Sequence, residues 1–244
     1  MDKAFNFLMR RLSAIGKLND EDRHRVDSLP FNQRRFSKGE EVVAEGSKST
    51  SCCLVVTGYL HRSKELATGS RQIFSLHMPG DIPDLHSLHL PRMDHSLVAT
   101  APAEVALIPH TAIQGVLGQS STLTALFWRD TLIDAAAFRA WMLMLGQAEA
   151  LVRMAHLFCE LYVRSKLVGL NRDNSFALPI SQTDLADMLG TSTVHANRTL
   201  QDLRSQELVD FKRGRVTILR WEELARLGMF DSSYLHIVGG AQTE

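Results

Sequence analysis

The chain has 244 residues, which is long enough for two domains that each bury a core of their own. Its 45% hydrophobic and 22% charged residues are typical of a folded globular protein, and no apolar run approaches the roughly 20 residues of a membrane span. The N-terminus lacks the pattern of a secretory signal and 3 cysteines provide no disulfide framework, so we expect a cytoplasmic protein without a membrane partner. Basic and acidic residues are equal at 27 each, so charge has to be examined by segment.

Residues 1–118 are predicted to form a β-domain. Between residues 39 and 110, short apolar segments alternate with turn residues, and short strands at such regular spacing favour an antiparallel barrel or sandwich. The predicted strands are residues 41–44, 52–56, 72–76, 96–99 and 105–108. The turn residues between them include Gly46, Gly58, Gly69, Pro79, Gly80 and Pro102.

Residues 119–146 are predicted to form one long helix, since no proline occurs between residues 122 and 170. Apolar side chains recur there at steps of three and four, apart from a gap at Asp130, and share one helix face: Leu123, Leu126, Ile133, Ala137, Trp141 and Met144. This face either packs on the barrel of its own chain or forms a dimer seam. We favour the dimer seam, because a helix of this length has more apolar face than a small barrel covers.

Residues 147–244 are predicted to contain a helix-turn-helix. A second helix follows Gly146, and the capping-box pattern of residues 181–184 then begins a shorter helix that ends at Gly190. Thr191 or Ser192 can cap the next helix. The apolar residues that the two short helices are expected to bury are Leu185, Met188, Leu189, Ala196, Leu200 and Leu203.

A basic β-hairpin is predicted directly after these helices. Residues 208–211 and 215–219 alternate in hydrophobicity around the tip Lys212-Arg213-Gly214. From residue 190 to residue 220, six basic side chains stand against three acidic ones, a net charge of +3. Positive charge is therefore concentrated where a wing would meet a phosphate backbone.

The second short helix carries side chains suited to reading DNA bases. Val194, Asn197, Arg198 and Gln201 lie at i, i+3, i+4 and i+7, so they share one exposed face. Arginine can bind guanine through two hydrogen bonds, asparagine or glutamine can pair with adenine, and valine can touch a thymine methyl group. A solvated polar face on an ordinary helical subdomain is the alternative. The residues predicted to contact DNA are Ser181, Gln182, Ser192, Thr193, Val194, His195, Asn197, Arg198, Gln201, Lys212, Arg213 and Arg215.

Residues 179–219 resemble the winged helix of the CRP/FNR family, the bacterial relatives of the cAMP receptor protein. The segments 39–42, 45–46 and 79–81, together with Gly58, resemble that family's cyclic-nucleotide-binding-like domain, and residues 154–161 resemble the stretch after its hinge. The resemblance implies an α+β fold with an N-terminal β-barrel or jelly roll, a long dimerisation helix and a C-terminal winged helix-turn-helix. It also implies a homodimer that binds a near-palindromic DNA site and responds to an effector in the barrel.

Within this resemblance, the family's reading positions fall on Thr193, Val194, Asn197 and Arg198. Arg198 matches the family's arginine, whereas Val194 stands where many members carry glutamate. A carboxylate that could accept a hydrogen bond from cytosine is therefore missing. We expect the preferred DNA sequence to differ accordingly.

The cAMP-binding pattern of the family is not matched. Cyclic-AMP-binding members hold the ribose with a Gly-Glu pair and the phosphate with an arginine followed by a hydroxyl residue. Pro83 and Asp84 stand for that pair here, Asp94 near the arginine position would repel a phosphate, and Arg92 lies one residue from the required place. We therefore expect an effector other than cAMP. The residues expected to line its pocket are Asp84, Leu85, Arg92, His95, Ser96, Phe138 and Arg139.

No cofactor and no metal ligand is assigned from the sequence. The three cysteines, Cys52, Cys53 and Cys159, are too few for the four-thiolate iron–sulfur centre of the family's oxygen-sensing branch, and the adjacent pair is expected to pack as small apolar residues. Imidazoles and carboxylates between residues 77 and 95 would suit zinc, iron or haem, but their spacing lacks the cupin metal pattern. Hydrogen-bonded or solvated imidazoles are the favoured interpretation, and metal binding stays open for His77, His86, His89 and His95.

The predicted function is that of a bacterial, homodimeric, sequence-specific DNA-binding transcription regulator without enzymatic activity. Its predicted partners are double-stranded DNA, a second copy of the chain, an unidentified small-molecule effector and RNA polymerase. The alternative is a cupin-like metal-binding barrel enzyme, or a metal- or haem-sensing protein, with a helical appendage. The effector, the operator and the direction of regulation stay open.

Overall fold

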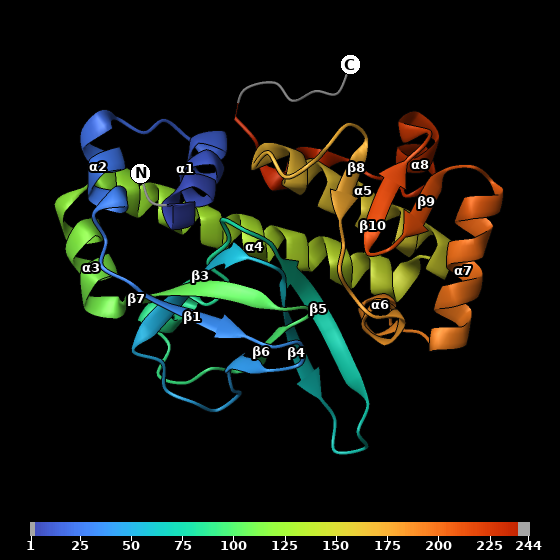
Figure 1. Ribbon diagram of the computed structural model, residues 1–244, viewed down its shortest axis with the longest axis horizontal. Coiled ribbons are helices and arrows are strands. Elements are labelled where there is room, and N and C mark those ends of the chain that lie inside the picture. The colour runs from blue at the N-terminus through green and yellow to red at the C-terminus, as the bar shows by residue number, and fades with distance from the viewer. Residues whose placement is uncertain (1–2, 239–244) are drawn as a thin grey trace. The chain divides into compact units, whose positions relative to one another are not determined.

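The computed structural model describes residues 3–238, so the predicted domain ends at residues 1–2 and 239–244 lie outside the described residues. The described residues fall into two compact units. The first contains residues 3–64, 75–135 and 236–238, and the second contains residues 65–74 and 136–235. Figure 1 shows the first unit mainly in blue to green and the second mainly in yellow to red.

Two β-sheets make up the barrel. The first has the order β1 (Asn32–Phe36), β7 (Ala103–Pro109), β3 (Ser51–Thr57), and the second has the order β2 (Glu41–Val43), β6 (Ser96–Ala99), β4 (Leu60–Glu65), β5 (Arg71–His77). Strands β1 and β3 pair antiparallel with β7, and β2 and β4 pair antiparallel with β6. The predicted antiparallel barrel and its five predicted strands are confirmed, while β1 and β4 are additional.

Strand β3 is buried on both faces because it separates two hydrophobic cores. Cys52 and Leu54 belong to a core shared with the helices, whereas Cys53 and Val55 belong to a core made by residues of the strands. Both thiols are at most 1% exposed, and burial raises the pKa of Cys53 well above its usual value. The two cysteines are therefore neutral, packed side chains, as predicted.

Helices cover one side of the barrel in the first unit. They are α1 (Lys3–Ile15), α2 (Asp20–Asp27), α3 (His110–Gln119) and the first half of α4 (Ser121–Gln147), and a single turn η1 (Leu85–Leu88) lies between β5 and β6. Figure 1 shows α1, α2 and α3 gathered around the start of α4. Phe5, Leu8 and Leu12 of α1 are at most 1% exposed and share a core with Leu123 of α4.

A buried ionic network ties α1 to α4. The guanidinium of Arg11 contacts Asp81 at 2.8 Å and Asp130 at 2.7 Å, and both carboxylates are almost fully buried. Burial raises the pKa of Asp130, although Arg11 counteracts that shift. The gap that Asp130 makes in the apolar pattern of the long helix is therefore the position that receives Arg11.

The prediction that the apolar stripe of α4 forms the dimer seam is wrong. Leu123, Leu126 and Ile133 pack in the core of their own chain, and Trp141 is also buried. At about 3.6 residues per turn, a second set of apolar side chains falls on the opposite side of the helix. These residues are exposed, and they are Trp128, Leu132, Met142 and Leu143. Helix α4 therefore carries two apolar faces, and the sequence pattern identified the inner one.

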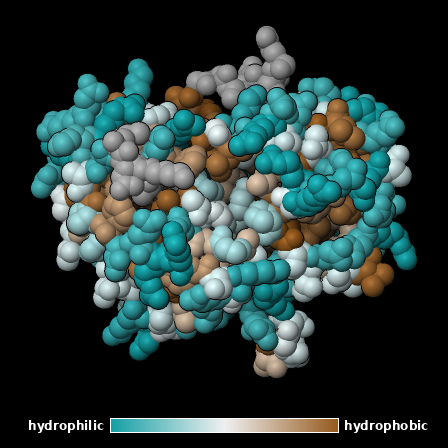
Figure 2. Space-filling view, viewed as in Figure 1, coloured by the Kyte–Doolittle hydropathy of each residue, from teal (hydrophilic) through white to brown (hydrophobic). Residues whose placement is uncertain are grey.

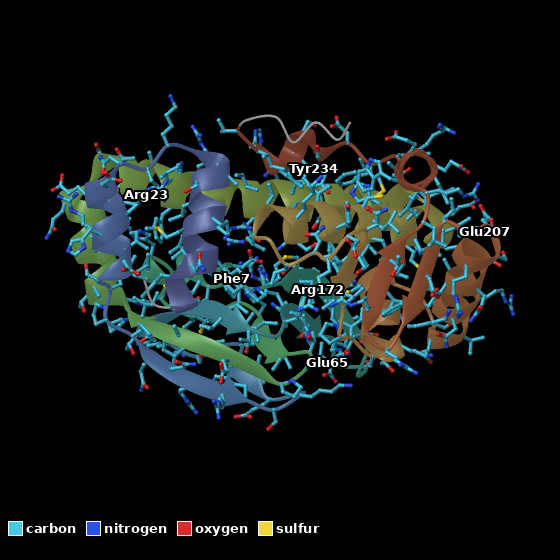
Figure 3. All side chains as sticks on the ribbon, turned by 45° about the horizontal axis from the view of Figure 1, so that its top comes forward. Phe7, Arg23, Glu65, Arg172, Glu207 and Tyr234 are labelled. Carbon is cyan, nitrogen blue, oxygen red and sulfur yellow. The ribbon has the colours of Figure 1, made fainter. Side chains whose placement is uncertain are left out.

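The second unit combines helices with a small sheet of order β8-β10-β9. Its remaining elements, in chain order, are α5 (Ala150–Leu167), β8 (Ser175–Ala177), α6 (Gln182–Leu189), α7 (Thr193–Ser205), β9 (Val209–Lys212), β10 (Arg215–Ile218), α8 (Trp221–Leu227) and η2 (Ser232–Leu235). The predicted helix after Gly146 and the predicted winged helix-turn-helix are confirmed. Glu207, labelled in Figure 3, lies in the turn between α7 and β9.

Glu160 of α5 organises the interior of the second unit. Its fully buried carboxylate accepts hydrogen bonds from Trp141 Nε1 at 2.9 Å and Tyr234 Oη at 2.8 Å, and it pairs with Arg164 at 3.0 Å. Tyr234 is labelled in Figure 3. Three donors thus satisfy one buried charge and fix α5 against the end of α4 and against η2.

The visible surface is largely hydrophilic. Figure 2 shows hydrophilic and neutral residues over most of the face in view, with hydrophobic residues in smaller groups between them. Among residues 3–238, no helix has both the length and the apolar composition that a membrane crossing requires.

Candidate nucleic-acid interface and effector region

Helix α6 begins at the predicted capping box. The Ser181 hydroxyl accepts a hydrogen bond from the backbone N–H of Asp184 at 3.0 Å, and the Asp184 carboxylate accepts one from the backbone N–H of Ser181 at 3.1 Å. Arg71 also pairs with Asp184 at 2.6 Å. Burial acts to raise the pKa of Asp184, but the bonds from Ser181 and Arg71 lower it overall. Gly190 ends the helix with a left-handed φ of 59°.

The outward face of α7 presents the predicted reading residues. Val194 is 71% exposed, and Arg198 and Gln201 are exposed as well. Asn197 is half-buried, and its side-chain amide donates a hydrogen bond to Gln182 Oε1 at 2.9 Å. The first residue of α6 therefore holds one predicted reading residue of α7 in place, whereas Gln201 accepts a hydrogen bond from Arg204 at 3.5 Å.

The start and the inner face of α7 refine the prediction. Ser192, and not Thr191, is the N-cap, and its hydroxyl accepts the backbone N–H of His195 at 3.2 Å. Ala196 and Leu203 are buried as predicted, but Leu200 is only half-buried. The neighbouring Thr199 is buried, and its hydroxyl donates to the His195 carbonyl at 2.9 Å, so it needs no outside partner.

The wing is a tight hairpin of β9 and β10. Lys212 pairs with Arg215 in the ladder, so two residues form the turn, and both have positive φ: 52° for Arg213 and 70° for Gly214. Such a turn matches the twist of the strands. It also leaves Lys212 and Arg213 exposed at the tip, whereas Arg215 is half-buried and donates to Ser175 Oγ at 2.9 Å.

One concave surface brings much of the predicted interface together. A hollow of about 480 Å³ is bordered by α6, α7 and the wing. Its lining includes five predicted contact residues: Ser181, Gln182, Asn197, Gln201 and Arg213. Among the described residues, Arg198 and Arg213 form no ion pair, so both guanidinium groups can meet an anion.

Several polar residues predicted to line an effector pocket form hydrogen bonds within the barrel. Asp84 is fully buried and accepts a hydrogen bond from the backbone N–H of Cys53 at 2.7 Å. Arg92 donates to the Gly46 carbonyl at 2.7 Å, and Ser96 donates to Glu41 at 2.7 Å. The polar groups of these three residues thus serve the barrel itself. Phe138 and Arg139 are exposed residues of the second unit.

Sequence reasoning missed Arg62 and Asp134. The Arg62 guanidinium is almost buried, donates to the Pro83 carbonyl at 3.0 Å and pairs with Asp134 at 2.6 Å. His77 lies near this pair, and burial together with the charge of Arg62 lowers the pKa of His77 to about 4. Alternation along β4 could only have indicated that Arg62 faces the same way as Leu60. No pattern in the sequence indicates its partner, which is 72 residues away.

The four histidines of the 77–95 stretch separate into two kinds. His77 bonds to Ser75 at 2.8 Å, and His89 is exposed. The rings of His86 and His95 lie together, with centroids 5.2 Å apart. His86 also lines an apolar hollow of about 330 Å³ bordered by η1, α3 and α4.

A barrel joined in one chain to a winged helix-turn-helix with an exposed cationic reading face defines a DNA-binding transcription regulator with a sensory domain. Family models agree: residues 33–120 match the cyclic nucleotide-binding domain, and residues 152–227 match the Crp-like helix-turn-helix domain. The chain belongs to the CRP/FNR family of transcription regulators.

Individual relatives show the same likeness. The nitrogen fixation regulation protein FixK of Rhizobium meliloti is 29% identical over 79% of this chain and 85% of its own length. A probable transcriptional activator of Rhizobium leguminosarum bv. viciae is 24% identical over 87% of this chain and 85% of its own. The structure of FixK2 from Bradyrhizobium japonicum superposes with a TM-score of 0.74 and 26% identity, covering 82% of this chain and 98% of that one.

Proposed function

We propose that two copies of this chain bind a near-palindromic double-stranded DNA site through α7 and regulate transcription there, with RNA polymerase as a further partner. The observation that carries the proposal is the outward face of α7, where Val194, Arg198 and Gln201 are exposed together. An exposed arginine on such a helix can donate two hydrogen bonds to guanine O6 and N7 in the major groove. Val194 offers apolar contact in place of a carboxylate.

Contacts to phosphates surround the reading face in this proposal. Lys212 and Arg213 at the wing tip meet the neighbouring backbone, while the N-termini of α6 and α7 hold phosphates through their N–H groups. The full set proposed to contact DNA is Ser181, Gln182, Ser192, Thr193, Val194, His195, Asn197, Arg198, Gln201, Lys212, Arg213 and Arg215. The side chains of Arg215 and Ser181 already form hydrogen bonds within the domain. These two residues are therefore proposed to position the wing and the start of α6 as well as to contact DNA.

The dimer is proposed to form along the exposed face of α4. Trp128, Leu132, Met142 and Leu143 are each at least half exposed in the single chain. Water contact with so many large apolar side chains on one helix is unfavourable, and a second α4 packed against them would remove it. The two copies of α7 would then reach half-sites about 34 Å apart, one turn of DNA.

The barrel is proposed to respond to an effector other than cAMP. Asp84, which stands for the ribose-binding glutamate, is committed to the backbone of β3, and Arg92 is committed to Gly46. The pocket proposed from the sequence consists of Asp84, Leu85, Arg92, His95, Ser96, Phe138 and Arg139. In this scheme residues 1–118 sense the effector, residues 119–146 dimerise and residues 147–244 bind DNA, without catalysis and in the cytoplasm.

Three measurements test the proposal. Selection of bound sites from a random DNA pool should return two related half-sites in inverted order, and sedimentation at micromolar concentration should give twice the mass of one chain. Recovery of DNA without a shared motif would contradict sequence-specific binding. A clean micromolar calorimetric isotherm with cAMP would overturn the effector assignment.

A further inference from the structure

Three side chains with metal-binding chemistry meet beside strand β6. His86 comes from η1, and Asp94 and His95 come from the residues just before the strand. One nitrogen of each imidazole and one carboxylate oxygen lie within 4.8 Å of one another. His95 Nδ1 and Asp94 Oδ1 are 2.8 Å apart. Two imidazoles and a carboxylate form a donor set that zinc and non-haem iron use in sites that keep coordination positions open.

His86 has a coordination position that protein groups leave unused. Its Nε2 is buried and has no hydrogen-bond partner within residues 3–238. A buried nitrogen without a partner costs free energy, which coordination of a metal ion would recover.

The surrounding charges permit a cation at this place. Arg62 lies near the two imidazoles, but its charge is paired with Asp134 at 2.6 Å. The Asp94 side chain is 73% exposed and the His95 side chain is 7% exposed, so the cluster has one ligand at the surface and one in the interior. An ion can reach it from solvent through Asp94 and then contact the buried nitrogens.

We propose that His86, Asp94 and His95 bind a divalent transition-metal ion such as Zn²⁺, with a fourth position open to water or a small ligand. Bonds of about 2.0–2.2 Å to a tetrahedral ion place ligand atoms within about 3.6 Å of one another, so rotation of the side chains completes the site. Of the four histidines for which the sequence left metal binding open, two are not part of this site. His77 bonds to Ser75 and Asp81, and His89 is exposed. Use of the ion as the regulatory effector rests on the proposed function, but its binding does not.

Metal titration of the full chain tests the site. Protein freed of metal by a chelator is titrated with Zn²⁺ by calorimetry and with Co²⁺ by visible absorption. We expect one ion per chain and the absorption bands of four-coordinate Co²⁺. Asp94→Asn changes an exposed side chain and should fold normally, yet weaken Zn²⁺ binding at least tenfold. His86→Gln should weaken it at least a hundredfold, and His89→Gln on the same segment should leave it unchanged.

The outcomes separate the site from the proposed function. Absence of Zn²⁺ binding by the wild-type chain, or unchanged affinity in both Asp94→Asn and His86→Gln, would overturn the metal site. The same variants are then assayed for binding to a selected DNA site in chelator, where we expect wild-type affinity. If the wild-type chain bound no DNA either in chelator or with saturating Zn²⁺, while still binding Zn²⁺, the proposed function would be contradicted and the metal site would stand.

Discussion

The surface proposed to face DNA and the barrel interior use their charges in opposite ways. On α7 and the wing, Arg198 and Arg213 are exposed and form no ion pair among the described residues. In the barrel, Arg11 and Arg62 are nearly buried, and each is held by carboxylates within 2.8 Å. The first arrangement is ready to meet a polyanion. The second is already neutralised, so its arginines stabilise the sensory domain and are poor candidates for binding a phosphate ligand.

The largest effect is expected from the barrel interior. Arg11→Met removes the cation that lies between Asp81 and Asp130, and it leaves two buried carboxylates without the guanidinium that pairs with both. We expect the free energy of unfolding to fall by about 3–5 kcal/mol in urea titrations at pH 7. Arg35→Met is the matched control, because Arg35 pairs with Glu104 while 85% exposed, and it should cost less than about 1 kcal/mol. Equal losses in the two variants would show that the buried network is unimportant.

The pH dependence of the free energy of unfolding should report on His77, which lies in the same barrel interior. Burial and Arg62 lower the pKa of His77 to about 4 from 6.5, against the opposing carboxylates of Asp81 and Asp134. As pH falls below 6.5, His77 becomes protonated in the unfolded chain but stays neutral in the folded chain. The free energy of unfolding therefore decreases until about pH 4. His77 alone would account for about 3 kcal/mol of that decrease.

His77→Gln should therefore flatten the stability profile between pH 6.5 and pH 4 relative to the wild type, whatever its stability at pH 7. Unfolding by urea at several pH values in that window measures both slopes. Parallel slopes for the two proteins would mean that His77 titrates normally in the folded barrel.

A third prediction concerns the exposed face of α4, which is proposed to form the dimer seam. Leu132→Asp places a charge among the apolar side chains of the proposed seam, where Leu132 is 50% exposed in the single chain. We expect the dimer to weaken by about 2 kcal/mol or more, roughly thirtyfold or more in dissociation constant. Leu66→Asp, at a residue that is 68% exposed outside α4, is the control and should leave the dimer unchanged. Sedimentation over a concentration series distinguishes the two, and a fully dimeric Leu132→Asp protein would exclude this face.

The contrast between the regions also explains what the sequence could predict. The capping box at residues 181–184, the end of α6 at Gly190 and the turn at Arg213-Gly214 are local signals, and each of them is confirmed. The barrel charges are not local, because Arg11 and Asp130 are 119 residues apart in the chain. Strand β1 was missed because four of its five residues are exposed at a sheet edge, so it shows no apolar alternation.

The prediction of the dimer face of α4 was wrong for a related reason. Periodicity shows that a helix has an apolar stripe, but it does not show what the stripe packs against. The stripe through Leu123 and Trp141 is covered by its own chain, and the exposed stripe through Trp128 and Met142 is shorter and interrupted by Arg139. Only the fold separates the two.

The division of work between reading helix and wing is tested most directly by selecting binding sites with three proteins in parallel: the wild type, Arg198→Ala and Arg213→Ala. Arg198→Ala should lose about 1–3 kcal/mol of binding free energy and relax the preference at one base pair in each half-site. Arg213→Ala should select the wild-type motif, bind all sequences more weakly and lower the salt slope by about one unit. A changed motif for Arg213→Ala, together with an unchanged motif for Arg198→Ala, would contradict the assignment of α7 as the reading helix.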